Sequence, residues 1–388
     1  MTGRQRILAA FRGEPCDRVP FCPNIYYWFY SRRAKGTLPD ELKAACHPFD
    51  ALHALGADIL ARWDTQAATS SVYTGGECED AWTGESPFSE AVVTAFNTYP
   101  RSKSERHSRI RTPYGELTQT WKLSEEAAAD FISEYWWKTW EQYPAIRHVV
   151  EHTNYVFDAA SFRTWKQRAG DDGVMMVHLT QSPLKTFHWL AGPENASLFA
   201  VDHPGEMREL AEIHEAKVLA LLEEIVDEPA AEVFISLDNL DSAFFPPGFY
   251  RDYCASYFSR VADVIHSRGK IFVVHACGRN KVLLPLVGAS RVDCLEGLTP
   301  PPMGDVPLGQ ARAMCGYENF TVNGGMDAPR LEMREGEHEA LDRYVGELFG
   351  SMRDKRHFIF ASSCSTPYPA SWDNLRRLHD AALEYGRM

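Results

Sequence analysis

Short apolar runs alternate with longer amphipathic segments through the second half of this chain, and that alternation constrains its fold more than any other feature. The apolar runs are GVMMVHL (173–179), AEVFISL (231–237), KIFVVHA (270–276), VDCLEGL (292–298), FTVNGG (320–325) and HFIFASS (357–363). The amphipathic segments between and after them are 183–190, 205–226, 247–268, 280–289, 307–315, 338–353 and 372–386. Strands that alternate with helices predict βα units and a parallel sheet. So many units within residues 169–388 favour an α/β fold of the (β/α)8 TIM-barrel type, and no G-x-G-x-x-G motif supports a dinucleotide-binding sheet.

Residues 1–168 are less regular and are predicted to elaborate a single barrel domain that spans 1–388. We expect a helix at 3–11, a helix and a short strand within 49–60, inserted antiparallel strands within 70–121, and mostly helix over 124–168. The regular βα units of 169–388 would then carry the functional site.

Composition excludes several classes of function. The chain has 40 basic and 53 acidic residues, a net charge of −13, which disfavours binding to nucleic acid. The chain has no long apolar stretch that would predict a membrane span and no apolar leader that would predict a signal peptide. A cytoplasmic location is therefore expected. Nine scattered cysteines are typical of reduced thiols and not of a disulfide framework.

A His-x-Cys pair, His275 and Cys277, ends the apolar run 270–276. Alternate residues of an extended chain point the same way, and catalytic side chains of α/β barrels lie where strands end. Cys364 also follows an apolar run. Imidazole and thiolate ligands favour zinc, and three protein ligands with one open position are typical of catalytic zinc. The sequence therefore predicts that His275, Cys277 and Cys364 bind Zn²⁺, although a buried cysteine without a metal is the common alternative.

Other polar residues follow the remaining runs. Glu296 comes one βα unit after Cys277 and is predicted as a ligand or as a partner of one, with a catalytic role. Catalytic roles are also predicted for Asp238 and Asn323, and substrate contacts for His178, Asp241, Asp327 and Tyr27. The alternatives are ordinary: Asp and Asn after a strand often cap a helix or a turn, a histidine can belong to the core, and the aromatic run 25–30 can be packing.

The segments HACG, VDCLEGLTPPPMGD and FTVNGGMD, the late Cys364 followed by a helix, and the early CDRVP resemble the uroporphyrinogen decarboxylase superfamily, and within it the zinc methyltransferase branch. The resemblance is spread over the chain and is most specific from about residue 236 onward. It implies a metal held by His275, Cys277 and Cys364, with Glu296 in the interval where related barrels add a glutamate. Decarboxylases resemble one another in an arginine-rich RQAGRY-type motif, whereas this chain reads FCPNIYYW at 21–28.

The resemblance implies a zinc-dependent methyltransferase that moves a methyl group between a corrinoid (cobalamin) or folate carrier and a thiol or methylated small molecule. The corrinoid would be bound to a partner protein, and the chain could form a homodimer. Zinc would lower the pKa of a bound thiol, or alternatively polarise a methylated substrate whose methyl group leaves to the corrinoid. The competing interpretation is a uroporphyrinogen-type decarboxylase that needs no metal. A structural zinc clamp or an accessory corrinoid-binding role are the non-enzymatic alternatives.

Overall fold

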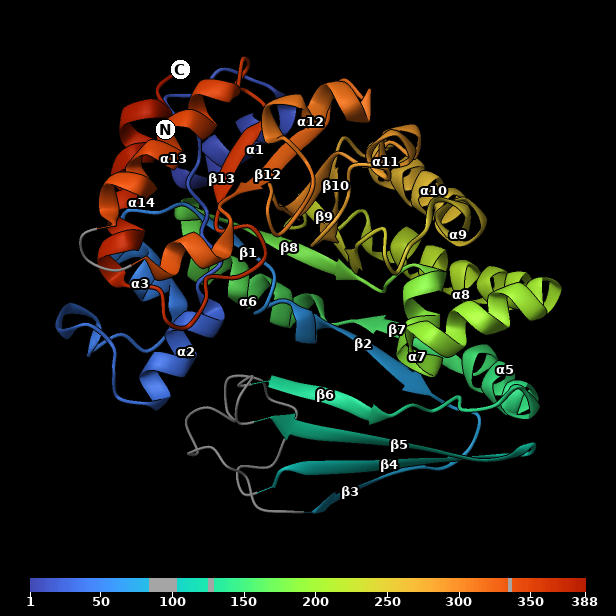
Figure 1. The fold of residues 1–388 in the computed structure, drawn as a ribbon. Coiled ribbons are helices and arrows are strands. Elements are labelled where there is room, and N and C mark those ends of the chain that lie inside the picture. Colours follow the sequence, from blue (N-terminus) through green and yellow to red (C-terminus); the bar gives the residue numbers. More distant parts are fainter. Residues whose placement is uncertain (84–102, 125–128, 334–336) are drawn as a thin grey trace.

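A computed structural model describes residues 1–83, 103–124, 129–333 and 337–388, and within these residues one sheet contains seven parallel strands in the order β1-β8-β9-β10-β11-β12-β13 (Figure 1). The strands are β1 (Ile59–Ala61), β8 (Gly173–Leu179), β9 (Val233–Leu240), β10 (Ile271–Ala276), β11 (Cys294–Leu298), β12 (Thr321–Gly325) and β13 (Phe358–Ala361). Six of them coincide with the six apolar runs. This confirms the predicted TIM-type fold.

Residues 20–22 take the eighth position, between β13 and β1. Phe360 donates its amide to the Pro20 carbonyl at 2.9 Å and accepts a hydrogen bond from the Cys22 amide at 2.8 Å. On the other side, the Asp58 amide donates to the Phe21 carbonyl at 2.8 Å. Proline at position 20 lacks an amide hydrogen, so this segment pairs through few bonds and does not form a regular strand.

Helices cover the outside of the barrel, as the amphipathic segments predict. They are α7 (Pro183–Asp202), α8 (Pro204–Ile225), α9 (Pro247–Tyr253), α10 (Ala255–His266), α11 (Leu284–Ala289), α12 (Leu308–Cys315), α13 (His338–Ser351) and α14 (Trp372–Tyr385). The segment predicted at 183–190 continues to 202 with a kink at Gly192, whose φ of 79° is non-helical. Every residue of β8, β10, β11, β12 and β13 is buried because side chains pack both inside the barrel and against these helices.

Helix α1 (Gly3–Arg12) closes the end of the barrel at which the strands begin, which is called the lower end below. Its apolar face, including Ile7 and Phe11, packs against inward side chains of the strands such as Val174, Val233 and Ile271. The opposite end of the barrel, where the strands terminate, is left for the loops that carry the predicted site residues.

The N-terminal elaboration contains two antiparallel sheets, one formed by β2 (Thr69–Tyr73) and β7 (Thr153–Phe157) and the other by β3 (Cys78–Thr83), β4 (Glu105–Thr112), β5 (Gly115–Ser124) and β6 (Ala129–Glu134). Figure 1 shows the second sheet beside the barrel. The strands predicted within 70–121 are confirmed, except that 84–102 lie outside the described residues. The remaining elements are α2 (Tyr26–Ala34), α3 (Pro48–Leu55), α5 (Tyr143–Glu151), α6 (Ala159–Ala169) and the 3-10 turns η1 (Asp40–Leu42), η2 (Gln66–Ala68), η3 (Trp140–Gln142), η4 (Gly170–Asp172) and η5 (Ala328–Glu332).

The prediction of mostly helix over 124–168 is wrong for two segments. β6 pairs with β5, and β7 pairs with β2 from Thr69↔Phe157 to Tyr73↔Thr153. Both pairings depend on a partner strand, which a local pattern does not reveal. Within the described part of the chain, no helix is long and apolar enough to cross a membrane.

Candidate metal centre

The inner layer at the upper end of the barrel is polar. Val273 and Cys294 line the apolar interior below, and the residues two positions further along the same strands are His275 and Glu296. Because side chains alternate along a strand, these two point into the barrel as well. They are also opposite each other in the register between β10 and β11.

His275 lies between Glu296 and Cys364. Its Nδ1 is hydrogen-bonded to Oε2 of Glu296, and its Nε2 lies 3.6 Å from Sγ of Cys364. The thiol of Cys277 is in turn hydrogen-bonded to Cys364. The three predicted ligands, His275 on β10, Cys277 just after it and Cys364 in the loop after β13, are therefore neighbours, and Glu296 lies on the far side of the imidazole from Cys364.

Arg62 is a fifth member of the centre, which the sequence analysis missed. It directly follows β1, and its Nε lies 3.4 Å from Glu296. Both side chains are buried, 5% and 9% exposed respectively, so their charges interact strongly. The strand-end rule that selected the other residues could have selected Arg62, but β1 is only three residues long and gives a weak pattern.

The ionisation of the centre follows from these contacts. Burial lowers the pKa of His275, but the neighbouring Glu296 carboxylate and Cys364 together raise it to about 9. The hydrogen bond from Cys277, together with the charge of His275, lowers the pKa of Cys364 to about 4, whereas that of Cys277 is raised. Burial raises the pKa of Glu296, yet Arg62 and His275 lower it to about 2. These directions favour the thiolate form of Cys364 beside the imidazole of His275.

Asn24 fixes the loop that carries Cys364. Its side-chain amide donates to the Cys364 carbonyl at 2.6 Å, and its backbone amide donates to Oγ of Ser362 at 3.0 Å. The Thr366 amide donates to the Asn24 carbonyl at 2.8 Å. Ser363, between these contacts, has a φ of 58°, an uncommon value for a residue with a side chain. The sequence analysis missed Asn24, because nothing local connects it with a loop some 340 residues away.

Asp238 and Asp241 follow β9. Asp238 is fully buried and accepts hydrogen bonds from the Ser182 amide at 3.0 Å and from Ser236 Oγ at 2.6 Å, so it fixes the start of α7. Asp241 accepts from the Ala243 amide at 2.9 Å. Its other oxygen lies so close to Gly278 that a Cβ there would be 1.9 Å away, and Gly278 has a φ of 80°. A glycine is therefore required next to Cys277.

His178 and Asn323 also face the upper interior. His178 Nε2 is hydrogen-bonded to the Arg62 carbonyl at 2.7 Å, and burial lowers the pKa of this histidine to about 3. Asn323 is opposite Glu296 in the sheet register and lines a small cavity with Glu296 and Arg62. That cavity, about 10 Å³, has room for about one water molecule. A substrate would have to bind above this layer.

Asp327 and Tyr27 lie at the periphery of this group. Asp327 is buried, its carboxylate lies 3.4 Å from Arg330, and its Oδ1 has no hydrogen-bond partner among the described residues. Tyr27, on α2, packs edge-on against Trp63 with ring centroids 5.6 Å apart, and Arg62 lies over the same Trp63 ring.

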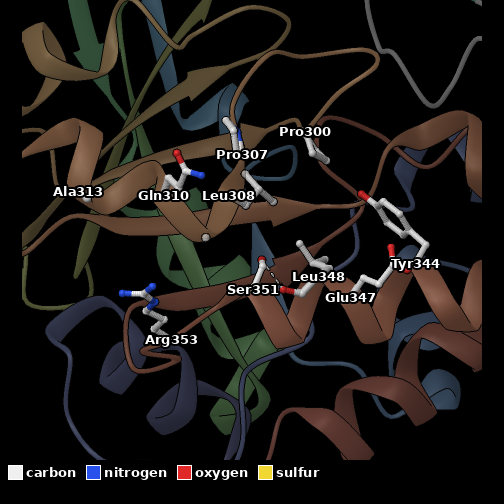
Figure 2. Close-up of a pocket in the computed structure, with 11 residues that line it drawn as sticks. Pro300, Pro307, Leu308, Gln310, Ala313, Tyr344, Glu347, Leu348, Ser351 and Arg353 are labelled. Carbon is white, nitrogen blue, oxygen red and sulfur yellow. Dashed lines mark hydrogen bonds between the residues drawn. The ribbon is translucent and has the colours of Figure 1, made fainter.

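Further cavities lie outside the centre. One, about 350 Å³, runs beside the barrel mouth between β2, β7 and α7 and is lined by His178, Thr186 and Trp189 among others. Another, about 650 Å³, lies between α12 and α13 (Figure 2). Figure 2 shows Tyr344, Glu347 and Gln310 around it, and none of the predicted site residues lines it.

Within the described ranges, no set of three or more His, Cys, Asp or Glu side chains forms a group that could hold a metal ion. The close pair in the centre remains His275 Nε2 and Cys364 Sγ, 3.6 Å apart.

Comparison with known proteins gives one family match. The family model described as uroporphyrinogen decarboxylase (URO-D) matches residues 119–385. No protein among those with curated descriptions matches the chain. Among solved structures, a methyltransferase from Methanosarcina mazei is similar over 99% of both chains, with 14% identity and a TM-score of 0.57. The D-psicose 3-epimerase of Clostridium cellulolyticum H10 is similar over 59% of this chain and 83% of its own, with 12% identity and a TM-score of 0.35.

Proposed function

Since this chain belongs to the uroporphyrinogen decarboxylase family, we propose that it is a member that binds zinc and transfers methyl groups. The contact between His275 and Cys364 carries this proposal. Zinc bonds of about 2.3 Å to sulfur and about 2.0–2.1 Å to nitrogen, at a tetrahedral angle, put two such ligands roughly 3.6 Å apart. The distance between Cys364 Sγ and His275 Nε2 is 3.6 Å.

The surrounding residues also fit a zinc centre. Cys277, hydrogen-bonded to Cys364, would supply the third ligand, and a fourth position would stay open for substrate. Glu296 is hydrogen-bonded to Nδ1 of His275, the ring nitrogen that faces away from Cys364. Carboxylates that orient a zinc-bound imidazole make the same contact. We therefore propose an orienting role for Glu296, with Arg62 holding the carboxylate in place.

Zinc bound here would keep a substrate thiol deprotonated near neutral pH, which is the form that attacks a methyl group. The chain's own residues would hold the zinc in position, because Glu296 fixes His275 and Asn24 fixes Cys364. We propose a corrinoid on a partner protein as the methyl carrier. The structural likeness to a methyltransferase from Methanosarcina mazei supports methyl transfer as the reaction.

Zinc analysis and methyl transfer test the proposal together. Purified protein should contain one zinc per chain and should demethylate methylcobalamin in the presence of 2-mercaptoethanol. The visible spectrum of the corrinoid measures the rate of this reaction. Cys277→Ala should lose the zinc and at least about 100-fold in rate, because a thiolate ligand is removed, yet keep nearly the same melting temperature.

Cys78→Ala is the matched control, because Cys78 is an exposed cysteine on β3 away from the centre. It should retain both zinc and activity. A chain that binds no zinc and decarboxylates uroporphyrinogen would contradict the proposal and favour the metal-free decarboxylase. Unfolding of Cys277→Ala would instead indicate a structural zinc site.

A further inference from the structure

The cavity of about 350 Å³ between β2, β7 and α7 is called the neutral cavity below because its walls carry no charge. Thirteen of the described residues line it, and none of them is Asp, Glu, Lys or Arg, although these four types make up 24% of the chain. His178 in its wall is uncharged as well, since burial lowers the pKa of this imidazole to about 3. By contrast, the cavity between α12 and α13 is lined by Glu347 and Arg353. A charged ligand in the neutral cavity would lose its hydration without gaining a counter-charge.

A buried histidine on α8 ties the walls of the neutral cavity together. His214 is 1% exposed, and its Nδ1 accepts a hydrogen bond from the Tyr155 hydroxyl at 3.1 Å. Its Nε2 lies 2.9 Å from the Gln181 carbonyl and 3.2 Å from Oγ1 of Thr186. One side chain therefore fixes three lining residues, which come from β7, from the loop after β8 and from α7.

A second contact joins the N-terminal elaboration to the barrel across the same cavity. Oγ1 of Thr69, at the start of β2, donates a hydrogen bond to the carbonyl of His178 on β8 at 2.7 Å, and both residues line the cavity. The walls are thus held by hydrogen bonds within the protein before any ligand is bound. Ligand sites are usually pre-formed in this way and measure roughly 300–1,000 Å³, a range that includes the neutral cavity.

The lining residues offer both apolar surface and uncharged hydrogen-bonding groups. Trp189 and Leu190 contribute apolar side chains, Gln66 and Gln181 contribute amides, and Ser71 contributes a hydroxyl. Amides and hydroxyls donate and accept hydrogen bonds without carrying a charge. A complementary ligand therefore has an apolar part and a neutral polar group.

We propose that the neutral cavity binds an uncharged small molecule in which a ring carries a carboxamide or a similar neutral polar group. This site is separate from the candidate metal centre, because none of the described residues that line it is a proposed zinc ligand. The inference is independent of the proposed function, so that either can fail while the other stands.

Two pairs of probes that differ in charge test the inference: nicotinamide against nicotinate, and benzamide against benzoate. Their affinities for the purified protein are measured by saturation-transfer NMR titration. Each amide should bind at least about tenfold more tightly than its carboxylate, because the carboxylate would be desolvated without a counter-charge. Metal-free and zinc-loaded protein should bind the amides equally well.

Variants of the lining residues locate the binding. Ser71→Trp should abolish binding of both amides, because the indole would occupy the cavity, and the exposed position of Ser71 on β2 leaves room for the larger side chain. Its melting temperature checks that the variant is folded. Gln181→Leu should weaken binding about fivefold, the effect of about one hydrogen bond. Gln310→Leu is the matched control, since it makes the same change in the cavity between α12 and α13.

Three results would overturn the inference. The first is a failure of both amides to bind, or carboxylates that bind as tightly as the amides. The second is amide binding that survives Ser71→Trp. The third is amide binding that requires zinc, which would place the probes at the metal centre instead of in the neutral cavity.

Discussion

Asn24 shows how much of the candidate centre depends on a residue that touches no proposed ligand atom of the metal. Its side-chain amide binds the Cys364 carbonyl, and its backbone binds Ser362 and Thr366 on both sides of that cysteine. These contacts fix the backbone from which Cys364 projects toward His275. We therefore regard Asn24 as a positioning residue.

Asn24→Ala should weaken zinc binding by about 10- to 100-fold, the usual cost of removing a group that orients a ligand. Competition with a chromophoric chelator measures the affinity. In the cobalt-substituted protein, the thiolate-to-metal absorption should also weaken, since Cys364 would be less well placed. Asn319→Ala, on an exposed loop, is the control. Unchanged affinity and an unchanged cobalt spectrum would show that the loop holds its shape without Asn24.

At the scale of elements, the closure of the barrel depends on a buried carboxylate. Asp58, just before β1, accepts hydrogen bonds from Arg18 at 2.9 Å and from the Phe21 amide at 3.1 Å, and it also pairs with Arg6 of α1. It thus joins the lower helix, the segment 20–22 and β1. Asp58 is 4% exposed, so solvent cannot replace these partners.

Asp58→Ala should lower the free energy of unfolding by about 3–5 kcal/mol, because two arginines lose a buried partner. Urea denaturation followed by circular dichroism measures this. Asp172→Ala removes an exposed carboxylate at the same end of the barrel and should change stability by less than about 1 kcal/mol. A similarly small effect of Asp58→Ala would mean that residues 20–22 stay in place through their backbone bonds alone.

The elements also show what the sequence could and could not predict. The six apolar runs from 173 to 363 form strands because each has apolar side chains at consecutive positions and can therefore be buried on both faces. Since their ends share one side of the barrel, the positions of His275, Cys277 and Glu296 followed from the sequence. Cys364 could be placed by the same rule, whereas the zinc itself stays a prediction.

The parts that the sequence did not predict depend on distant partners. Residues 20–22 pair with β13 and β1, and β6 pairs with β5. None of these placements leaves a periodic signal in its own segment. Arg62 is the exception, because the strand-end rule applies to it and only the shortness of β1 concealed it.

Across the whole molecule, buried histidines make stability depend on pH. Burial lowers the pKa of His188 and of His214 to about 4, so neither binds a proton easily in the folded chain. In the unfolded chain histidine has a pKa of about 6.5. The unfolded state therefore binds more protons between these values, and the free energy of unfolding should fall as the pH falls from about 6.5 toward 4.

His188 offers a direct test of this pH dependence, because its Nε2 is buried with no hydrogen-bond partner among the described residues and its ring packs against Phe245. His188→Leu keeps an apolar side chain there and removes the titrating group. Near pH 8 the variant should unfold at about the same urea concentration as the wild type, whereas near pH 5 it should be the more stable of the two. His53→Leu, at a 45% exposed histidine, should show no such crossover. Since His214 still titrates, the variant should retain part of the acid sensitivity, and parallel pH profiles for wild type and His188→Leu would mean that His188 becomes protonated without unfolding.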